Sequence, residues 1–186
     1  MIYTERLVVR PFLATDFTDL FAYLALPETY RFEPGAPITI AEARALAAQR
    51  AQGNDFWAVV LQTSATLIGH IYFKQIEPPD LRTWEIGYIF HPGYQHQGYA
   101  TEAATGLLNF AMNAYPIHRV MARCNPENRA SWQLLERIGL RREAHLHKNI
   151  FFHRDEAGLP CWQDTFEYAL LREEGRYPID IQKENS

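Results

Sequence analysis

The stretch from Trp84 to Ala111 reads WEIGYIFHPGYQHQGYATEAATGLLNFA, and the rest of the chain can be placed around it. Residues 84–90 predict an apolar strand, a loop with two glycines follows, and Tyr99 begins an apolar helical pattern. A helix that starts directly after such a loop leaves its first backbone N–H groups without partners, and its dipole favours negative charge there. The stretch therefore predicts a phosphate-type anion site at the helix start. The same pattern is also typical of an ordinary strand–loop–helix connection.

The flanking residues predict a sheet covered by helices. Apolar patterns indicate strands at 7–10, 56–61, 67–73, 84–90, 119–124, 141–152 and 166–171. Helical patterns begin after Asp16, at the capping box of Thr39 and Glu42, at Tyr99 and near Ser131. The strand–helix–strand run from 84 to 124 implies a parallel pair. We therefore expect an α+β fold with a mixed, mostly antiparallel sheet of about six to seven strands and flanking helices.

Composition bounds the size and the setting of the protein. The 186 residues, 47% of them hydrophobic, predict a single domain over 1–186 with a loosely ordered tail at 172–186. The formal net charge of -4 argues against a broad nucleic-acid surface. The two cysteines lack C-x-x-C spacing, which argues against a disulfide framework or a structural zinc site. Because residues 1–10 lack a signal-peptide core and no apolar run could span a bilayer, we expect a cytoplasmic protein with no membrane partner.

Several motifs occur together in a recognisable order. Gln95-x-x-Gly98-x-Ala100, followed by Thr101-Glu102-Ala103, resembles the acyl-CoA pyrophosphate loop of the GNAT N-acetyltransferases, most closely the branch that acetylates ribosomal-protein N-termini. The resemblance extends to Glu5–Leu7, Arg10-Pro11, Trp84–Tyr88, Asn128-x-x-Ser131, Leu135–Leu140 and Tyr168–Leu171. His96 stands where that branch usually has glycine. If this position requires a positive φ, histidine is among the less costly replacements.

The resemblance implies an acetyl-CoA-dependent enzyme that transfers an acetyl group directly to a primary amine, with no metal. A protein or peptide N-terminal α-amine, from a ribosomal or another protein, is the first acceptor. A small amine, such as a polyamine, an aminoglycoside or an amino-acid derivative, is the alternative. A non-catalytic CoA-binding module would keep the same fold without turnover. The protein would be a monomer or a homodimer, with no direct contact to nucleic acid.

The residues expected to bind the cofactor lie in and around the loop. A backbone N–H near Ile89 or Phe90 would stabilise the oxyanion, and Asn128 would contact the pantetheine arm or fix its loop. The predicted cofactor-binding residues are Ile89, Phe90, Gln95, His96, Gln97, Gly98, Tyr99, Ala100, Thr101, Asn128 and Ser131. An Asn N-cap followed by a first-turn Ser is also an ordinary way to begin a helix.

Acyl transfer to an amine requires a base and a group that assists the departing thiolate. Glu85 is the predicted base, because its strand leads into the loop; the alternative is a surface carboxylate or the partner of an Arg. Ser131 is the predicted thiolate acid, by resemblance to the Asn-x-x-Ser pattern. Tyr168 is a rival acid, although a tyrosine in the final strand also fits a core position with one hydrogen-bonded hydroxyl.

The acceptor site and a metal site are the remaining questions. By resemblance, the first two helices and the loop between them roof the acceptor pocket, so Tyr30, Arg31, Phe32 and Glu33 of that loop are predicted substrate contacts, as is Glu85 on its strand. The alternative for residues 30–33 is a solvated loop with aromatic anchors. His145-x-His147 would share one strand face, but no third ligand stands at a recognisable spacing, so no metal is predicted. Cys124 lies in an apolar strand, where a cysteine is usually a packed hydrophobe rather than a nucleophile.

Overall fold

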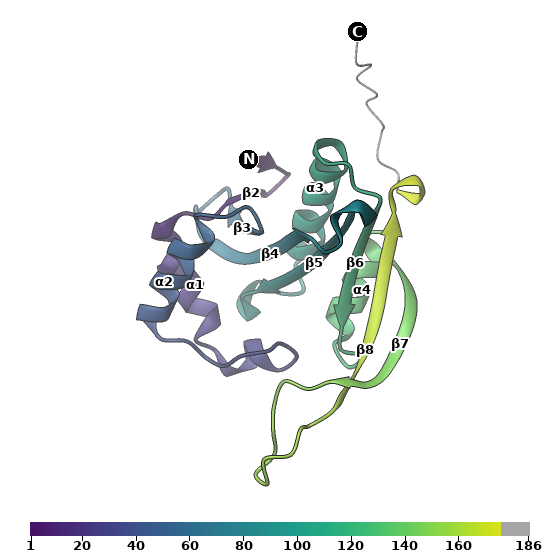
Figure 1. The fold of residues 1–186 in the computed structure, drawn as a ribbon. Helices are drawn as coiled ribbons and strands as arrows, with labels where there is room; N and C mark the ends of the chain where they lie inside the picture. Colours follow the sequence, from purple (N-terminus) through teal and green to yellow (C-terminus); the bar gives the residue numbers. More distant parts are fainter. Residues whose placement is uncertain (176–186) are drawn as a thin grey trace.

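The computed structural model describes residues 1–175 and contains one mixed, eight-stranded sheet (Figure 1). The strand order is β1-β2-β3-β4-β5-β6-β8-β7, and only the β5/β6 pair is parallel. The strands are β1 (Ile2–Tyr3), β2 (Leu7–Pro11), β3 (Phe56–Leu61), β4 (Leu67–Gln75), β5 (Thr83–Phe90), β6 (Arg119–Cys124), β7 (Arg141–Ile150) and β8 (Gln163–Leu171). The predicted fold class is confirmed. The sheet has more strands than predicted because the two residues of β1 also pair with β2.

The helices begin close to where the sequence predicts them. They are α1 (Phe17–Leu24), α2 (Ile40–Arg50), α3 (Tyr99–Ala114) and α4 (Arg129–Arg137). The Thr39 side chain accepts a hydrogen bond from the Glu42 N–H, and the Glu42 carboxylate accepts one from the Thr39 N–H. The predicted capping box is therefore present. The tail predicted to be loosely ordered starts at Arg172. Its first residues form the short helix η5 (Arg172–Glu174), and residues 176–186 lie outside the described part.

Two apolar clusters show how the helices are layered on the sheet. On β3, Val59 packs in the cluster that contains α3 and α4, whereas its neighbours Ala58 and Val60 pack in the cluster that contains α1 and α2. Successive residues of a strand point to opposite faces, so the two helix pairs cover opposite faces. Within residues 1–175, no helix combines the length and the apolar character needed to cross a bilayer.

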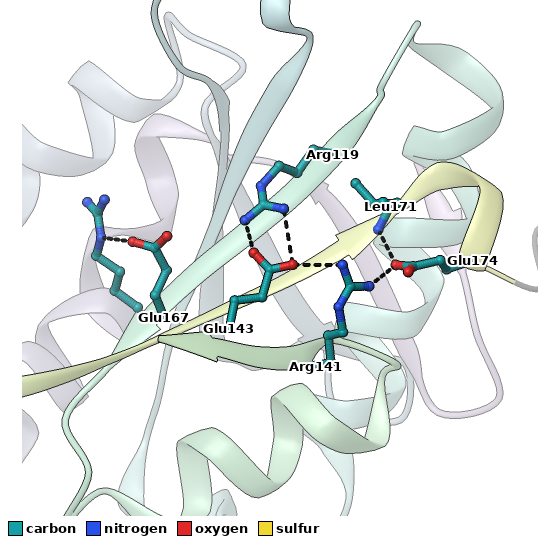
Figure 2. Close-up of polar contacts among 7 residues, drawn as sticks. Arg119, Arg141, Glu143, Glu167, Leu171 and Glu174 are labelled. Atoms are coloured by element: carbon teal, nitrogen blue, oxygen red, sulfur yellow. Dashed lines mark hydrogen bonds and ion pairs between the residues drawn. The ribbon is translucent and has the colours of Figure 1, made fainter. Parts of the chain in front are cut away.

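The uncovered surface of β6, β8 and β7 carries a network of ion pairs (Figure 2). A β-bulge between Arg142 and Ala144 directs Glu143 across β8, where it pairs with Arg119 of β6 and, at 2.7 Å, with Arg141. Arg141 also pairs with Glu174, which in turn accepts the Leu171 N–H at 3.0 Å. Exposed pairs of this kind contribute little energy individually. They nevertheless connect Glu174, near the end of the described residues, to β7 through Arg141 and to β8 through Leu171.

The parallel pair is short, and this shapes the middle of the molecule. β5 and β6 pair only from Thr83 to Glu85 against Arg119 to Met121. Beyond that point β5 stays paired with β4 as far as Phe90, while β6 stays paired with β8 as far as Cys124. The last residues of β5 therefore have one backbone edge that is not bonded to a strand within the described residues.

Gly69 of β4 is required for the end of β5 to stay in place. A Cβ at this position would lie 2.6 Å from the Ile89 carbonyl oxygen and 2.7 Å from a ring carbon of Phe90. We expect Gly69→Ala to lower the free energy of unfolding by about 1–3 kcal/mol, because the clash is with backbone that cannot rotate away. Chemical denaturation measures this. Gly53→Ala is the matched control, since a Cβ there meets nothing within 4 Å; equal stability of both variants would contradict the prediction.

Candidate active site

A cavity of about 1120 Å³ opens where β5 separates from β6. Its walls are the segment from Glu28 to Glu33, the end of β5, the loop before α3 with the first turn of that helix, and the start of α4. Most of the predicted site residues line it: Arg31, Phe32, Glu33, Ile89, Phe90, Gln95, His96, Gly98, Tyr99, Ala100, Thr101, Asn128 and Ser131. The fold thus brings the predicted cofactor and acceptor residues to one cavity.

The loop between β5 and α3 is fixed by its own side chains. His91 Nδ1 accepts the Gly93 N–H at 2.9 Å, and Gln97 Nε2 donates to the Gly93 carbonyl at 3.2 Å. Gln97 does not line the cavity, since its side chain is turned into the loop. His96 has a φ of 59° and Gly98 a φ of 83°, so both adopt the left-handed conformation. Histidine therefore occupies a position that favours glycine, which costs conformational energy but is compatible with the turn.

This geometry leaves backbone donors free at the start of α3. Within residues 1–175, the N–H groups of His96, Gln97 and Gly98 have no hydrogen-bond acceptor, and the first intrahelical cap bond is made by the Glu102 N–H. The first turn of the helix adds its own unbonded N–H groups. An anion bound here would receive several hydrogen bonds and the favourable end of the helix dipole.

Glu102 holds the start of α3 against the N-terminal segment. Its carboxylate accepts from Thr4 Oγ1 at 2.6 Å and from Arg6 N and Nε, both at 2.7 Å. Partial burial alone would raise the pKa of Glu102, but the hydrogen bonds from Thr4 and Arg6 outweigh it and the net pKa is lowered. Arg6 also donates to the Gln97 carbonyl at 3.0 Å and stacks over Tyr99. The loop is consequently held from outside as well as from within.

The end of β5 turns its unpaired backbone edge towards the cavity. The His91 N–H bonds to the Ile68 carbonyl of β4, so by the alternation of a strand the N–H and C=O of Phe90 point the other way. Gln95 Nε2 donates to the Phe90 carbonyl at 3.2 Å, which agrees with this direction. The Phe90 N–H is thus the oxyanion donor that the geometry favours over that of Ile89.

Ser131 and Tyr88 form a hydrogen-bonded pair beside the cavity. Tyr88 Oη lies 3.0 Å from Ser131 Oγ and donates to the Ser131 carbonyl at 2.9 Å. Burial raises the pKa of Tyr88 well above its usual value, so its hydroxyl stays protonated at neutral pH. Asn128 Oδ1 accepts the Ser131 N–H at 3.2 Å, and Asn128 therefore caps α4 while also lining the cavity. Sequence reasoning did not single out Tyr88, which appears there only at the end of the Trp84–Tyr88 motif, because its contact with Ser131 joins residues far apart in the chain.

Glu33 is the carboxylate of this cavity with the most perturbed ionisation. Its half-buried side chain has no hydrogen bond or ion pair within residues 1–175. Burial without a compensating cation raises the pKa of Glu33 to about 7. A carboxyl group with a pKa near neutrality can both accept and release a proton at physiological pH.

Besides Gln97, three predicted residues lie outside the cavity. Glu85 is half-buried, opposite Lys74 of β4 and Met121 of β6, and does not line the cavity. Tyr168 is fully buried and donates to Glu136 at 3.0 Å; burial and then Glu136 raise its pKa to about 12. Tyr30 donates to the Leu24 carbonyl at 2.9 Å and packs on the α1/α2 cluster. The cavity geometry thus gives no support to Glu85 or Tyr168 as catalytic groups, or to Tyr30 as a contact of the acceptor substrate.

The two cysteines do not line the cavity either. Cys124 is buried in the α3/α4 cluster, and burial raises its pKa to about 11, which describes a packed thiol rather than an activated nucleophile. Cys161 is exposed on the connection between β7 and β8, and neither cysteine is paired. The chemistry of the cavity therefore has to come from its oxygen and nitrogen groups.

Comparison with known proteins identifies the family of the chain. Residues 6–141 match the model of the Acetyltransferase (GNAT) domain. The chain belongs to the GNAT acetyltransferase family. The chain is 33% identical over 174 residues to YnaD of Bacillus subtilis, an uncharacterized N-acetyltransferase; the alignment covers 93% of this chain and 98% of YnaD. The family prediction and the assignment to acetyltransferases are confirmed.

Solved structures agree with this assignment. A GNAT-family acetyltransferase from Bacillus anthracis superposes with a TM-score of 0.83 at 32% identity, covering 93% of this chain and 99% of that one. A spermidine N-acetyltransferase from Vibrio cholerae, solved with CoA and spermine, superposes with a TM-score of 0.75 at 19% identity, covering 90% and 96%. The second likeness shows the shared fold alone. The GNAT fold thus supports acetyl transfer, while the acceptor of this acetyltransferase depends on its own residues.

The raised pKa of Glu33 has a consequence for stability. A carboxyl group with an unfolded pKa of about 4.3 and a folded pKa of about 7 favours the folded state below pH 4, and this contribution is lost as the pH rises to 7. We expect the melting temperature of Glu33→Gln to equal that of wild type near pH 4 and to lie a few degrees above it near pH 8.

Thermal unfolding at the two pH values measures this difference. Glu28→Gln is the matched control, because Glu28 lies on the same segment with an exposed side chain, and its difference from wild type should not change with pH. A Glu33→Gln variant that is no more stable than wild type near pH 8 would mean that Glu33 is not a buried, unpaired carboxylate.

Proposed function

We propose that this GNAT enzyme transfers the acetyl group of acetyl-CoA directly to the α-amine of a peptide or protein N-terminus. The observation that carries the proposal is the single cavity that joins the N–H-rich start of α3 to the carboxyl group of Glu33. A cytoplasmic protein, ribosomal or other, is the acceptor that we infer. The two unpaired cysteines are compatible with a reducing compartment.

The start of α3 supplies the binding site for the donor. The free N–H groups of His96, Gln97 and Gly98, with those of Tyr99, Ala100 and Thr101 in the first turn, would bind the pyrophosphate of acetyl-CoA. From there the pantetheine arm would follow the unpaired edge of β5 towards Asn128. The thioester carbonyl would then meet the Phe90 N–H, a donor that is already oriented when the substrate arrives.

The proposed reaction is a direct transfer. Glu33 accepts a proton from the amine, whose nitrogen attacks the thioester carbonyl carbon, and the oxyanion is stabilised by the Phe90 N–H. The intermediate collapses with cleavage of the C–S bond. Ser131, oriented by the hydroxyl of Tyr88, donates a hydrogen bond to the departing sulfur. Because the pKa of a thiol is about 8.5, the thiolate needs little further assistance to leave, and it takes its proton from water.

The ionisation of Glu33 favours an α-amine over more basic amines. A peptide α-ammonium has a pKa of about 7.7–8.0, close to the value of about 7 for Glu33, so proton transfer between them is nearly balanced. A primary alkylamine such as that of lysine, with a pKa of about 10.4, would resist deprotonation by the same group. Arg31 and Phe32, on the same segment as Glu33, offer one cation and one aromatic face to the acceptor.

A small amine metabolite is the second candidate acceptor. The Vibrio cholerae spermidine N-acetyltransferase has the same fold, and four glutamates besides Glu33 line the cavity, among them the exposed Glu28. A peptide remains first, because the pKa of about 7 for Glu33 lies closer to that of an α-ammonium than to that of a primary alkylamine.

The donor site is tested by Gly98→Val. The variant forces a branched side chain into a left-handed position beside the free N–H groups, with its Cβ 3.4 Å from Arg6. We expect acetyl-CoA affinity to fall at least about tenfold, or about 1.4 kcal/mol. Calorimetric titration measures this, after thermal unfolding has shown that the variant folds. His96→Gly is the control, which should bind at least as tightly as wild type. Unchanged affinity in folded Gly98→Val would exclude the loop from the donor site.

The base is tested by comparing Glu33→Gln with Glu85→Gln on N-terminal peptides. We expect Glu33→Gln to reduce kcat by about 10²–10⁴-fold and to abolish the rise of wild-type kcat with pH through about 7. Glu85→Gln should retain most of the activity. Thiol release from acetyl-CoA is the assay, with spermidine as the competing acceptor. A large loss of activity in Glu85→Gln alone would mean that Glu85 is the base. A kcat/KM for spermidine above that for the peptides would mean that the acceptor is a small amine.

A further inference from the structure

Three side chains that serve no role in acetyl transfer converge on the β7–β8 hairpin. His145 and His147 extend from β7, and Asp164 extends from β8. His145 Nε2 lies 2.7 Å and His147 Nδ1 lies 3.0 Å from the same oxygen of Asp164, Oδ2. The ligand atoms of the three residues lie within 4.8 Å of one another. None of the three lines the active-site cavity.

An irregularity of the hairpin builds this arrangement. β7 and β8 pair regularly at Leu146 and Thr165, and the next pair is Ile150 with Gln163. Residues 147–149 of β7 therefore face Asp164 alone, which makes a bulge of two extra residues. Lys148 at the centre of the bulge has a φ of 47°. Such bulges redirect side chains, and here both histidine rings are directed to one carboxylate.

Both the carboxylate and one of the imidazoles are held in place by neighbours. The Lys148 N–H donates to Asp164 Oδ1 at 2.9 Å, which leaves Oδ2 facing the rings. Phe166 packs its ring edge-on against His145, with centroids 4.9 Å apart. Hydrogen bonds from the bulge and from the two histidines, of which that from Lys148 is the strongest, lower the pKa of Asp164 to about 2. Ligands that are oriented in this way lose little freedom when they bind an ion.

We propose that His145, His147 and Asp164 form a binding site for a divalent transition-metal ion of the zinc class. Two imidazole nitrogens and one carboxylate oxygen are the ligand types that such ions prefer. Binding replaces the N–H···O contacts: each imidazole presents a lone pair, the three donor atoms move slightly apart around the ion, and solvent water completes the coordination. The ion would connect β7 to β8 at the point where the bulge interrupts their backbone pairing.

The chain spacing explains why the sequence predicts no metal. His145-x-His147 supplies two ligands, and Asp164 is 17 residues beyond His147. Only the hairpin brings the third ligand to the pair. The proposal is independent of the acceptor and of the base, and it can fail without affecting either.

Zinc titration of the full chain tests the site. The protein is first treated with a chelator and carries Cys161→Ser, because the Cys161 N–H bonds to the His153 carbonyl and the exposed thiol could recruit zinc with that histidine. We expect one zinc ion per chain, measured by calorimetry and by competition with a chromophoric chelator. His147→Ala and Asp164→Asn should each weaken binding at least about tenfold. His118→Ala removes an exposed histidine that does not belong to the cluster, and it should leave the zinc affinity unchanged.

A second measurement separates loss of a ligand from loss of the hairpin. Zinc should raise the melting temperature of the Cys161→Ser protein and of His118→Ala, and should leave that of His147→Ala unchanged. His147→Ala keeps the Lys148 to Asp164 bond that holds the bulge, so it decides the outcome if Asp164→Asn does not fold. Absence of zinc binding, or zinc affinity that is the same in His147→Ala as in its parent, would overturn the proposal.

Discussion

The separation of β5 from β6 is the constraint on which the active site depends. Three residue pairs hold the two strands in parallel, and then each strand continues with its other neighbour only. A backbone edge in the middle of a sheet is normally bonded to the next strand. Here the edge of β5 is left open at the point where the α3 loop begins. The Phe90 N–H, the start of α3 and the start of α4 therefore open onto the same space. The active site is a consequence of strand pairing before any side chain is considered.

Several costly local features lie around that space, and the surrounding structure supports the loop that carries two of them. His96 is left-handed, the N–H groups of the loop are unbonded, and Glu33 is a half-buried carboxylate without a cation. The loop is supported by bonds from His91 and Gln97, and by Arg6, which bridges Gln97 and Glu102. Strain that is concentrated near a cavity and supported from outside is a common property of functional sites. It also means that part of the stability of this fold serves to keep the cavity in its reactive form.

The far side of the sheet uses polar groups differently. The pairs of Arg119, Arg141, Glu143 and Glu174 lie on the surface of β6, β8 and β7, whereas His145, His147 and Asp164 gather at a bulge farther along the same hairpin. Both groups depend on an interruption of regular pairing between β7 and β8. An interruption changes which side chains meet, so one hairpin can carry an ion-pair network and a cluster of metal-type ligands side by side. Neither group is evident from the alternation of polar and apolar residues.

The sequence by itself predicted the strands from β2 to β8, the four helices and the loop before α3, because periodicity, capping and turn residues act over a few neighbouring positions. It indicated the family through the resemblance of its ordered motifs. It also indicated Asn128 and Ser131 through the Asn-x-x-Ser motif, and Glu33 as a substrate contact through the place of its loop between the first two helices. Only the tertiary structure decided which residues face the cavity. Glu85 and Tyr168 lie on suitable strands, but the pairing of those strands places them outside it, while the same pairing brings Tyr88 to Ser131. The ionisation of Glu33 and the meeting of Asp164 with two histidines likewise arise from burial and contacts between distant residues, which local patterns do not contain.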